Sequence, residues 1–108
     1  MSRLIHFYKG TVTETDGIKF ASKLEAAYYS YLKGLQQSGA VVTFLRQIPF
    51  YLPGGVKYVC DFLVFFRDGG CGFIDVKSME SRQFHDKKRL VEALYAPIVI
   101  EVVKRIPK

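Results

Sequence analysis

The apolar residues of this chain change their spacing along its length, and the changes predict its helices and strands. Between Ser22 and Gly39 they recur along one helical face, and the two end residues favour a helix start and stop. This face consists of Leu24, Ala27, Tyr28, Tyr31, Leu32 and Leu35. A second helix is predicted from Ser81 to Tyr95, before Ala96-Pro97, because the residue before proline avoids helical angles. Its buried stripe would be Phe84, Val91, Leu94 and Tyr95.

Strands are predicted where β-branched and aromatic residues lie between turn sequences. Asp16-Gly17 separates the strands of an N-terminal hairpin, and later turns separate three longer strands. The predicted ranges are Thr11 to Glu14, Ile18 to Phe20, Val41 to Leu52, Val56 to Phe66, Cys71 to Lys77 and, last, Ile98 to Val103. A strand, a helix and a strand in succession favour a right-handed crossover, which makes the last two strands parallel. We therefore expect an α/β fold, with a mixed sheet of about four strands flanked by helices, as one domain over residues 1–108.

Composition and charge narrow the classes of protein. A hydrophobic fraction of 49% and an aromatic fraction of 15% exclude a disordered tail. The net charge of +6 would attract a polyanion such as nucleic acid, although a charge of this size is also ordinary for solubility. No apolar run is long enough to span a membrane and the N-terminus lacks a secretory signal, so we expect a cytoplasmic protein. Cys60 and Cys71 are expected to be free, packed thiols.

Two carboxylates and a lysine are predicted to meet on the sheet. Asp61 shares one face of its strand with the apolar residues Val59, Leu63 and Phe65, and a carboxylate among apolar neighbours normally needs a positive partner or a metal. Asp75 and Lys77 share a face of the next strand. A two-residue turn, Asp68-Gly69, would separate Asp61 from Asp75, whereas a three-residue loop, Asp68-Gly69-Gly70, keeps them on one face. The longer loop would set Leu63 opposite Asp75 and Asp61 opposite Lys77.

Glu25 lies beside the apolar stripe of the first helix, where it can face along the sheet surface. Ser22-Lys23-Leu24-Glu25 is also a capping-box pattern. On this residue alone, the cap is the favoured interpretation.

Three segments stand out in order along the chain: Phe20-Ala21-Ser22-Lys23-Leu24-Glu25-Ala26 on a helix, Tyr58-Val59-Cys60-Asp61-Phe62 on a strand, and Ile74-Asp75-Val76-Lys77 after an Asp-Gly turn. Together they resemble the PD-(D/E)XK nuclease superfamily, and more narrowly its small phage-encoded proteins and Holliday-junction-resolvase-like members. The resemblance spans Gly17 to about Val102 and implies a restriction-endonuclease-like αβββαβ core. Cys60 stands where the superfamily's name has proline.

The resemblance implies a division of roles. Asp61, Asp75 and the backbone carbonyl of Val76 would hold Mg²⁺ or Mn²⁺, with Glu25 completing the site directly or through water. The ion would activate a water and stabilise charge on the phosphate, and Lys77 would align that water. Singly, each residue has a plainer explanation, such as an exposed ion pair for Asp75 and Lys77. These separate explanations leave the clustering of carboxylates unexplained.

DNA contacts are expected from the basic second helix, through Lys88, Lys87, Arg82 and Arg89. Lys88 lies within the apolar stripe, so it would point along the sheet toward the site or snorkel past the core edge. Arg46 and Gln47 are weaker candidates for contact with phosphate or water. His85 is expected to be a solvated surface residue. The N-terminal run Arg3, His6, Tyr8 and Lys9 would be either a DNA-contacting arm or, more simply, a frayed end.

Two functions of different classes fit these features. One is a Mg²⁺-dependent endonuclease acting on branched or four-way DNA in phage recombination or replication, alongside other proteins of those processes. The other is a non-catalytic nucleic-acid-binding domain with the same fold. Three carboxylates near a phosphate would repel it unless a metal is present, which favours the enzyme. Two symmetric cuts require a homodimer, for which Phe50, Tyr51 and Phe7 are candidate contacts.

Overall fold

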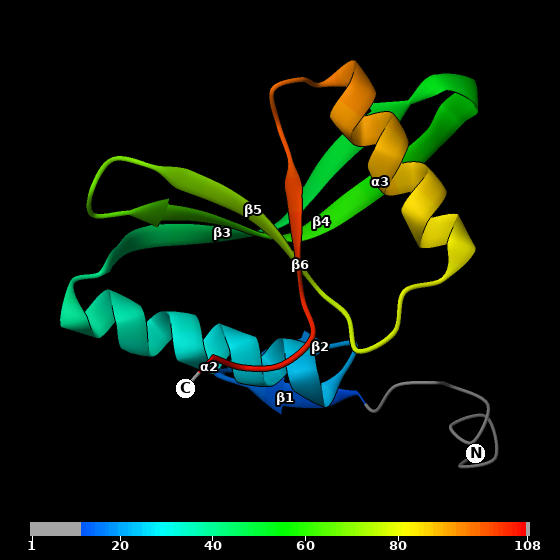
Figure 1. Cartoon of the computed structure of the whole chain (residues 1–108). Coiled ribbons are helices and arrows are strands. Elements are labelled where there is room, and N and C mark those ends of the chain that lie inside the picture. Colours follow the sequence, from blue (N-terminus) through cyan, green and yellow to red (C-terminus); the bar gives the residue numbers. More distant parts are fainter. Residues whose placement is uncertain (1–11, 108) are drawn as a thin grey trace, which may run out of the picture.

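The computed structural model describes residues 12–107 and shows the predicted α/β arrangement. In Figure 1, helix α2 lies below the sheet and helix α3 lies at the upper right, beside the paired strands β3 and β4. The sheet has the order β3-β4-β5-β6, in which β5 and β6 are parallel and the other neighbours are antiparallel. The elements are β1 (Thr13–Thr15), β2 (Ile18–Phe20), α2 (Lys23–Ser38), β3 (Val41–Leu52), a 3-10 turn η1 (Pro53–Gly55), β4 (Val56–Phe66), β5 (Cys71–Val76), α3 (Arg82–Leu94) and β6 (Ile100–Val103). The mixed sheet, both helices and the parallel crossover are therefore confirmed.

Helix α2 begins and ends at the predicted residues. The Ser22 hydroxyl accepts a hydrogen bond from the Glu25 backbone N–H at 3.0 Å, and Gly39 ends the helix with a φ of 90°. The side of α2 that packs against the sheet differs from the predicted face in that Ala26 and Tyr29 are buried and Ala27 is exposed. The resulting α2 cluster contains Phe20, Ala26, Tyr28, Tyr29, Leu32, Val41, Phe62, Val64, Ile74 and Val76.

Helix α3 covers a different part of the sheet. Its buried residues Phe84 and Val91 pack into an α3 cluster with Phe50, Leu52, Tyr58, Cys60 and Ile100. Two predictions were wrong here: Leu94 is 54% exposed rather than part of the stripe, and Phe50 is buried rather than free for a dimer contact. Phe7 and the N-terminal basic run lie outside the described residues.

Strands β3 and β4 stay paired with each other beyond the point at which β4 stops pairing with β5. The β4–β5 ladder runs from Phe65↔Cys71 to Phe62↔Ile74, whereas β3 and β4 stay paired out to Leu52↔Val56. Residues 48–60 therefore form a two-stranded ribbon, which α3 covers. Edge strand β3 carries Pro49, in agreement with the preference of proline for sheet edges.

The turn between β4 and β5 begins and ends one residue earlier than the predicted loop. Phe66 bonds Gly70, so the loop is Arg67 to Gly69, with Gly69 at a φ of 97°. The predicted register was therefore wrong by two residues, and the ladder, if continued, sets Asp61 opposite Asp75. A shift of two residues preserves the face of each side chain. Both cysteines are free, as predicted, but Cys71 is exposed and only Cys60 is packed.

Candidate active site

Asp61 and Asp75 are joined by hydrogen bonds where the β4–β5 ladder ends. The Asp61 backbone N–H donates to Asp75 Oδ1 at 3.0 Å, and the Val76 N–H donates to Asp61 Oδ2 at 2.8 Å. Carboxylate oxygens thus replace the carbonyl acceptors of a regular ladder. The two aspartates, which are far apart in sequence, therefore occupy one site.

The two carboxylates lie in different surroundings. Asp75 is 2% exposed, and its Oδ2 accepts a hydrogen bond from the Tyr58 hydroxyl. Asp61 is half-buried on the outward side of β4; the expected apolar neighbours Val59 and Phe65 are partly exposed, and the buried side of the strand carries the even-numbered residues. Burial and the adjacent Asp75 carboxylate raise the pKa of Asp61 to about 8, against the lowering effect of the bond from Val76. The pair therefore favours one bound proton or one bound cation.

Glu25 is buried beside these groups and is held by strand β3. It is 6% exposed, with Gln47 Nε2 at 3.3 Å and Arg46 at 3.7 Å from its Oε2. Desolvation raises its pKa, although the Arg46 guanidinium acts to lower it. The backbone of Glu25 does belong to the helix cap, but its side chain makes contacts that a capping role does not require. Arg46 and Gln47, which were candidates for contact with phosphate or water, therefore contact the Glu25 carboxylate in this structure.

Arg46 is itself held between a ring and a carboxylate. Its guanidinium lies 4.5 Å from the centroid of the Phe20 ring, a cation–π distance. Among residues 12–107, its Nε is the buried side-chain nitrogen or oxygen without a hydrogen-bond partner. Arg46 thus stabilises the charged form of Glu25 and keeps one donor unused.

A cleft collects the predicted catalytic groups. It has a volume of about 840 Å³, and Glu25, Asp61, Val76 and Lys77 line it between the start of α2 and the segment joining β5 to α3. We call it the carboxylate cleft. Asp75 lines a neighbouring cavity of about 250 Å³ instead, and Lys77 lines both spaces. The Lys77 ammonium lies 4.9 Å from the centroid of the Phe84 ring. The structure thus places Glu25, Asp61 and Lys77 along one cleft and Asp75 in the adjoining cavity, with Lys77 lining both.

The donor set fits a hard divalent cation by charge and atom type. Burial raises the pKa of Glu25 and of Asp61, so a bound cation would stabilise these two carboxylates as anions, and oxygen ligands suit Mg²⁺ or Mn²⁺. Within the described range 12–107, no group of three or more His, Cys, Asp or Glu side chains is already arranged around a metal position. These residues therefore fit a metal ion by their charge and atom type, and not by a preformed coordination geometry.

Residues 5–108 match the model of a family described as "Protein of unknown function (DUF1064)". The chain belongs to this family. No curated protein and no solved structure matches the chain. The DUF1064 description assigns no activity, so the case for a function rests on the site itself.

In this DUF1064 protein, the basic residues of α3 lie differently from the prediction. Lys88 pairs with Glu92 at 3.0 Å and lines neither space, so the expectation that it faces the site was wrong. Lys87 lines the smaller cavity, while Arg82 and Arg89 are exposed along the helix, Arg89 at 3.8 Å from Asp86. His85 is half-exposed, as expected, and lies 3.2 Å from Glu80.

Two functional candidates were missed by the sequence analysis. Tyr58 donates to Asp75, and Lys57 lines the smaller cavity. Tyr58 was visible in the Tyr58-x-x-Asp61-Phe62 pattern, but nothing in the sequence showed which carboxylate its hydroxyl would meet. Lys57 sits at a ribbon end whose position depends on packing against α3. No helix among residues 12–107 is long and apolar enough to cross a membrane.

Proposed function

We propose that this protein is a metal-dependent DNA endonuclease that hydrolyses phosphodiester bonds, selects branched or four-way DNA, and serves phage recombination or replication in the host cytoplasm. The observation that carries the proposal is the Asp61–Asp75 pair, joined through backbone N–H groups beside the buried Glu25. A cluster of carboxylates with a raised pKa in a cleft is typical of a catalytic site.

A divalent cation held by Asp61, Asp75 and the Val76 carbonyl, with Glu25, would supply a lower pKa for the attacking water and stabilisation of charge on the phosphate. The residues themselves provide the positioning. Tyr58 fixes the orientation of Asp75, and Arg46 with Gln47 fixes that of Glu25. Lys77 projects its ammonium at the junction of the two spaces, where it would offset negative charge in the transition state.

A non-catalytic nucleic-acid-binding domain is the alternative. It accounts for the net charge of +6 and for the basic α3. It does not account for three acidic side chains beside Lys77, which would repel a bound phosphate at close range. The buried Glu25, held by two side chains of β3, favours the enzyme.

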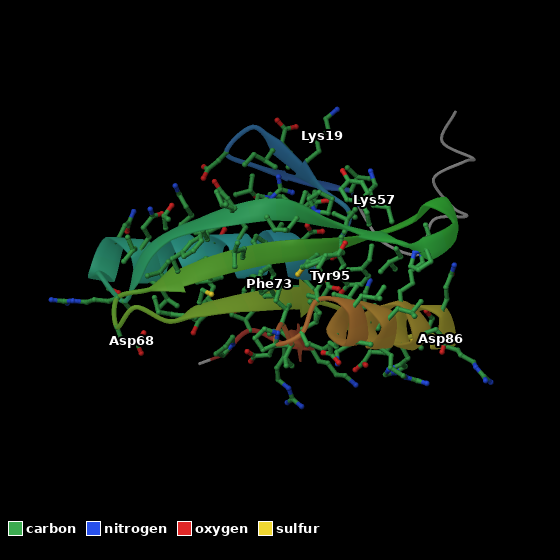
Figure 2. The ribbon with its side chains drawn as sticks, turned by 90° about the horizontal axis from the view of Figure 1, so that it is seen from above. Lys19, Lys57, Asp68, Phe73, Asp86 and Tyr95 are labelled. Carbon is green, nitrogen blue, oxygen red and sulfur yellow. The ribbon has the colours of Figure 1, made fainter. Side chains whose placement is uncertain are left out.

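The test is cleavage of linear, flapped, forked and four-way DNA, with Mg²⁺ and with EDTA. Asp75→Asn is expected to lose cleavage and keep its fold. Asp68→Asn is the matched control, because Asp68 also accepts a backbone N–H bond, from Gly70 at 2.8 Å. Figure 2 shows Asp68 at the opposite end of the sheet from Lys57. Full Mg²⁺-dependent cleavage by Asp75→Asn, or no cleavage of any DNA by the unaltered protein, would refute the proposal.

A further inference from the structure

Three lysines from different elements line the cavity of about 250 Å³ beside Asp75. Lys57 comes from β4 near the end of the ribbon, Lys77 follows β5, and Lys87 belongs to α3. Tyr58 and Phe84 supply aromatic walls. We call this space the lysine cavity. Side chains that are remote in sequence thus place three ammonium groups around one small volume.

These lysines are not neutralised by ion pairs. Among residues 12–107, none of the three takes part in a salt bridge, whereas Lys88 and Lys104 do. Of the carboxylates in the described part of the chain, Asp75 alone lines the cavity, and its two oxygens already accept hydrogen bonds from Asp61 and Tyr58. Three positive charges against one negative charge leave an excess of two, which suits a phosphate group.

The lysine cavity adjoins the carboxylate cleft. Lys77, Ser81 and Phe84 line both spaces, and Asp75 and Asp61 lie on either side of their shared boundary. A DNA strand with one phosphate in the cleft would carry its next phosphate along the strand close to the first. The lysine cavity is the adjacent positively charged space.

We propose that the lysine cavity binds a second phosphate of the same DNA strand, next to the phosphate that is cleaved. This inference rests on the proposed nuclease function and assigns the binding to Lys57 and Lys87. Such a contact fixes the register of the strand, so that one particular bond faces Asp61 and Asp75. The group is either a terminal phosphate monoester or an internal diester, because both present anionic non-bridging oxygens to the lysines.

Binding of short single-stranded DNA tests the inference apart from cleavage. The probes carry a 5′-phosphate, a 3′-phosphate or hydroxyls at both ends, and affinity is measured by fluorescence anisotropy over a series of salt concentrations in Ca²⁺. The proteins are the unaltered chain, Lys57→Gln, Lys87→Gln and the double variant. Lys19→Gln is the control, because Lys19 belongs to β2 and does not line the cavity.

The double variant is expected to bind DNA about tenfold more weakly, with a salt dependence that falls by about one unit of slope, whereas Lys19→Gln stays near the unaltered protein. Preference for a phosphorylated end that disappears in the variants identifies a terminal phosphate. An equal loss on all three probes identifies an internal one. A double variant with the affinity and salt slope of Lys19→Gln overturns the inference even if Asp75→Asn abolishes cleavage. Conversely, if the double variant loses binding but the unaltered protein cleaves no DNA, the lysine cavity is supported as a phosphate site and the nuclease function is refuted.

Discussion

Gln47 and Asp61 lie opposite each other at an interruption of the β3–β4 ladder, which is paired on both sides at Arg46↔Phe62 and Ile48↔Cys60. Gln47 has a φ of 58°, in the left-handed region that residues other than glycine rarely adopt. The interruption lets Arg46 and Gln47, successive residues of one strand, both reach Glu25. At the same position, the Asp61 N–H donates to the side-chain carboxylate of Asp75 on β5 instead of to a backbone carbonyl.

The strained backbone at Gln47 predicts opposite effects on stability and activity. Gln47→Gly relieves the left-handed strain, so the free energy of unfolding is expected to stay equal or to rise by up to about 1 kcal/mol. The same change removes the amide that bonds Glu25 at 3.3 Å, so cleavage is expected to fall. Denaturant unfolding and cleavage rates measured on one preparation check both expectations. Equal losses of stability and activity would mean that Gln47 is only structural.

The acceptor role of Asp61 separates two substitutions of the same residue. Asp61→Asn keeps an oxygen for the Val76 N–H, so the fold is expected to persist without cleavage. Asp61→Ala leaves that N–H without its acceptor, which is expected to cost about 1–3 kcal/mol of stability in addition to activity. Urea unfolding of the two variants distinguishes them. Equal stability of both would show that the bond contributes little.

Stability in the absence of metal is expected to depend on pH with a definite sign. The pKa of Asp61 is raised from an ordinary value of 3.8 to about 8, so the folded chain holds a proton that the unfolded chain releases. The stabilisation is present below about pH 4 and is lost as the pH rises toward 8, with a slope of at most about 1.4 kcal/mol per pH unit.

Unfolding in EDTA between pH 5 and pH 8 measures this slope. Asp61→Asn should flatten it, because the titrating group is gone. Added Mg²⁺ is expected to restore stability most strongly at pH 8, where the carboxylates are charged. A chain whose stability rises with pH over this range would contradict the raised pKa.

Assembly and substrate choice form a further prediction. A homodimer places two sites for symmetric cuts in branched DNA, and binding is expected to weaken steeply with salt. Of the aromatics suggested for the contact, Tyr51 remains suitable, since it is 67% exposed. Tyr51→Lys is therefore expected to shift light scattering toward the monomer, whereas Phe50→Lys would unfold the α3 cluster. A monomer that cuts linear and branched DNA equally would contradict both parts while leaving the nuclease intact.

The parts of the molecule that depend on local pattern were predictable, and those that depend on packing were not. Strands Val41–Leu52 and Val56–Phe66 match their predicted ranges because β-branched runs and turns mark them. The adjacency of Asp61 and Asp75 followed from the parity of the turn, although the loop itself was misplaced by one residue. Lys88 was misjudged because its partner Glu92 lies one turn further along, and a stripe pattern gives no preference between a cleft and a neighbouring carboxylate. The contact of Tyr58 with Asp75 and the place of Lys57 in the smaller cavity depend on tertiary packing, which no local pattern of residues shows.

The α2 and α3 clusters pack on different parts of one continuous sheet, and the aspartates lie where the two parts adjoin. Tyr58, whose hydroxyl donates a hydrogen bond to Asp75, belongs to the α3 cluster. Val76, whose backbone N–H donates to Asp61, belongs to the α2 cluster. The spacing of the carboxylates consequently depends on how the α2 cluster and the α3 cluster are packed relative to each other. Truncation of a buried side chain such as Leu32 or Val91, remote from any phosphate, would then change this spacing as well as the stability.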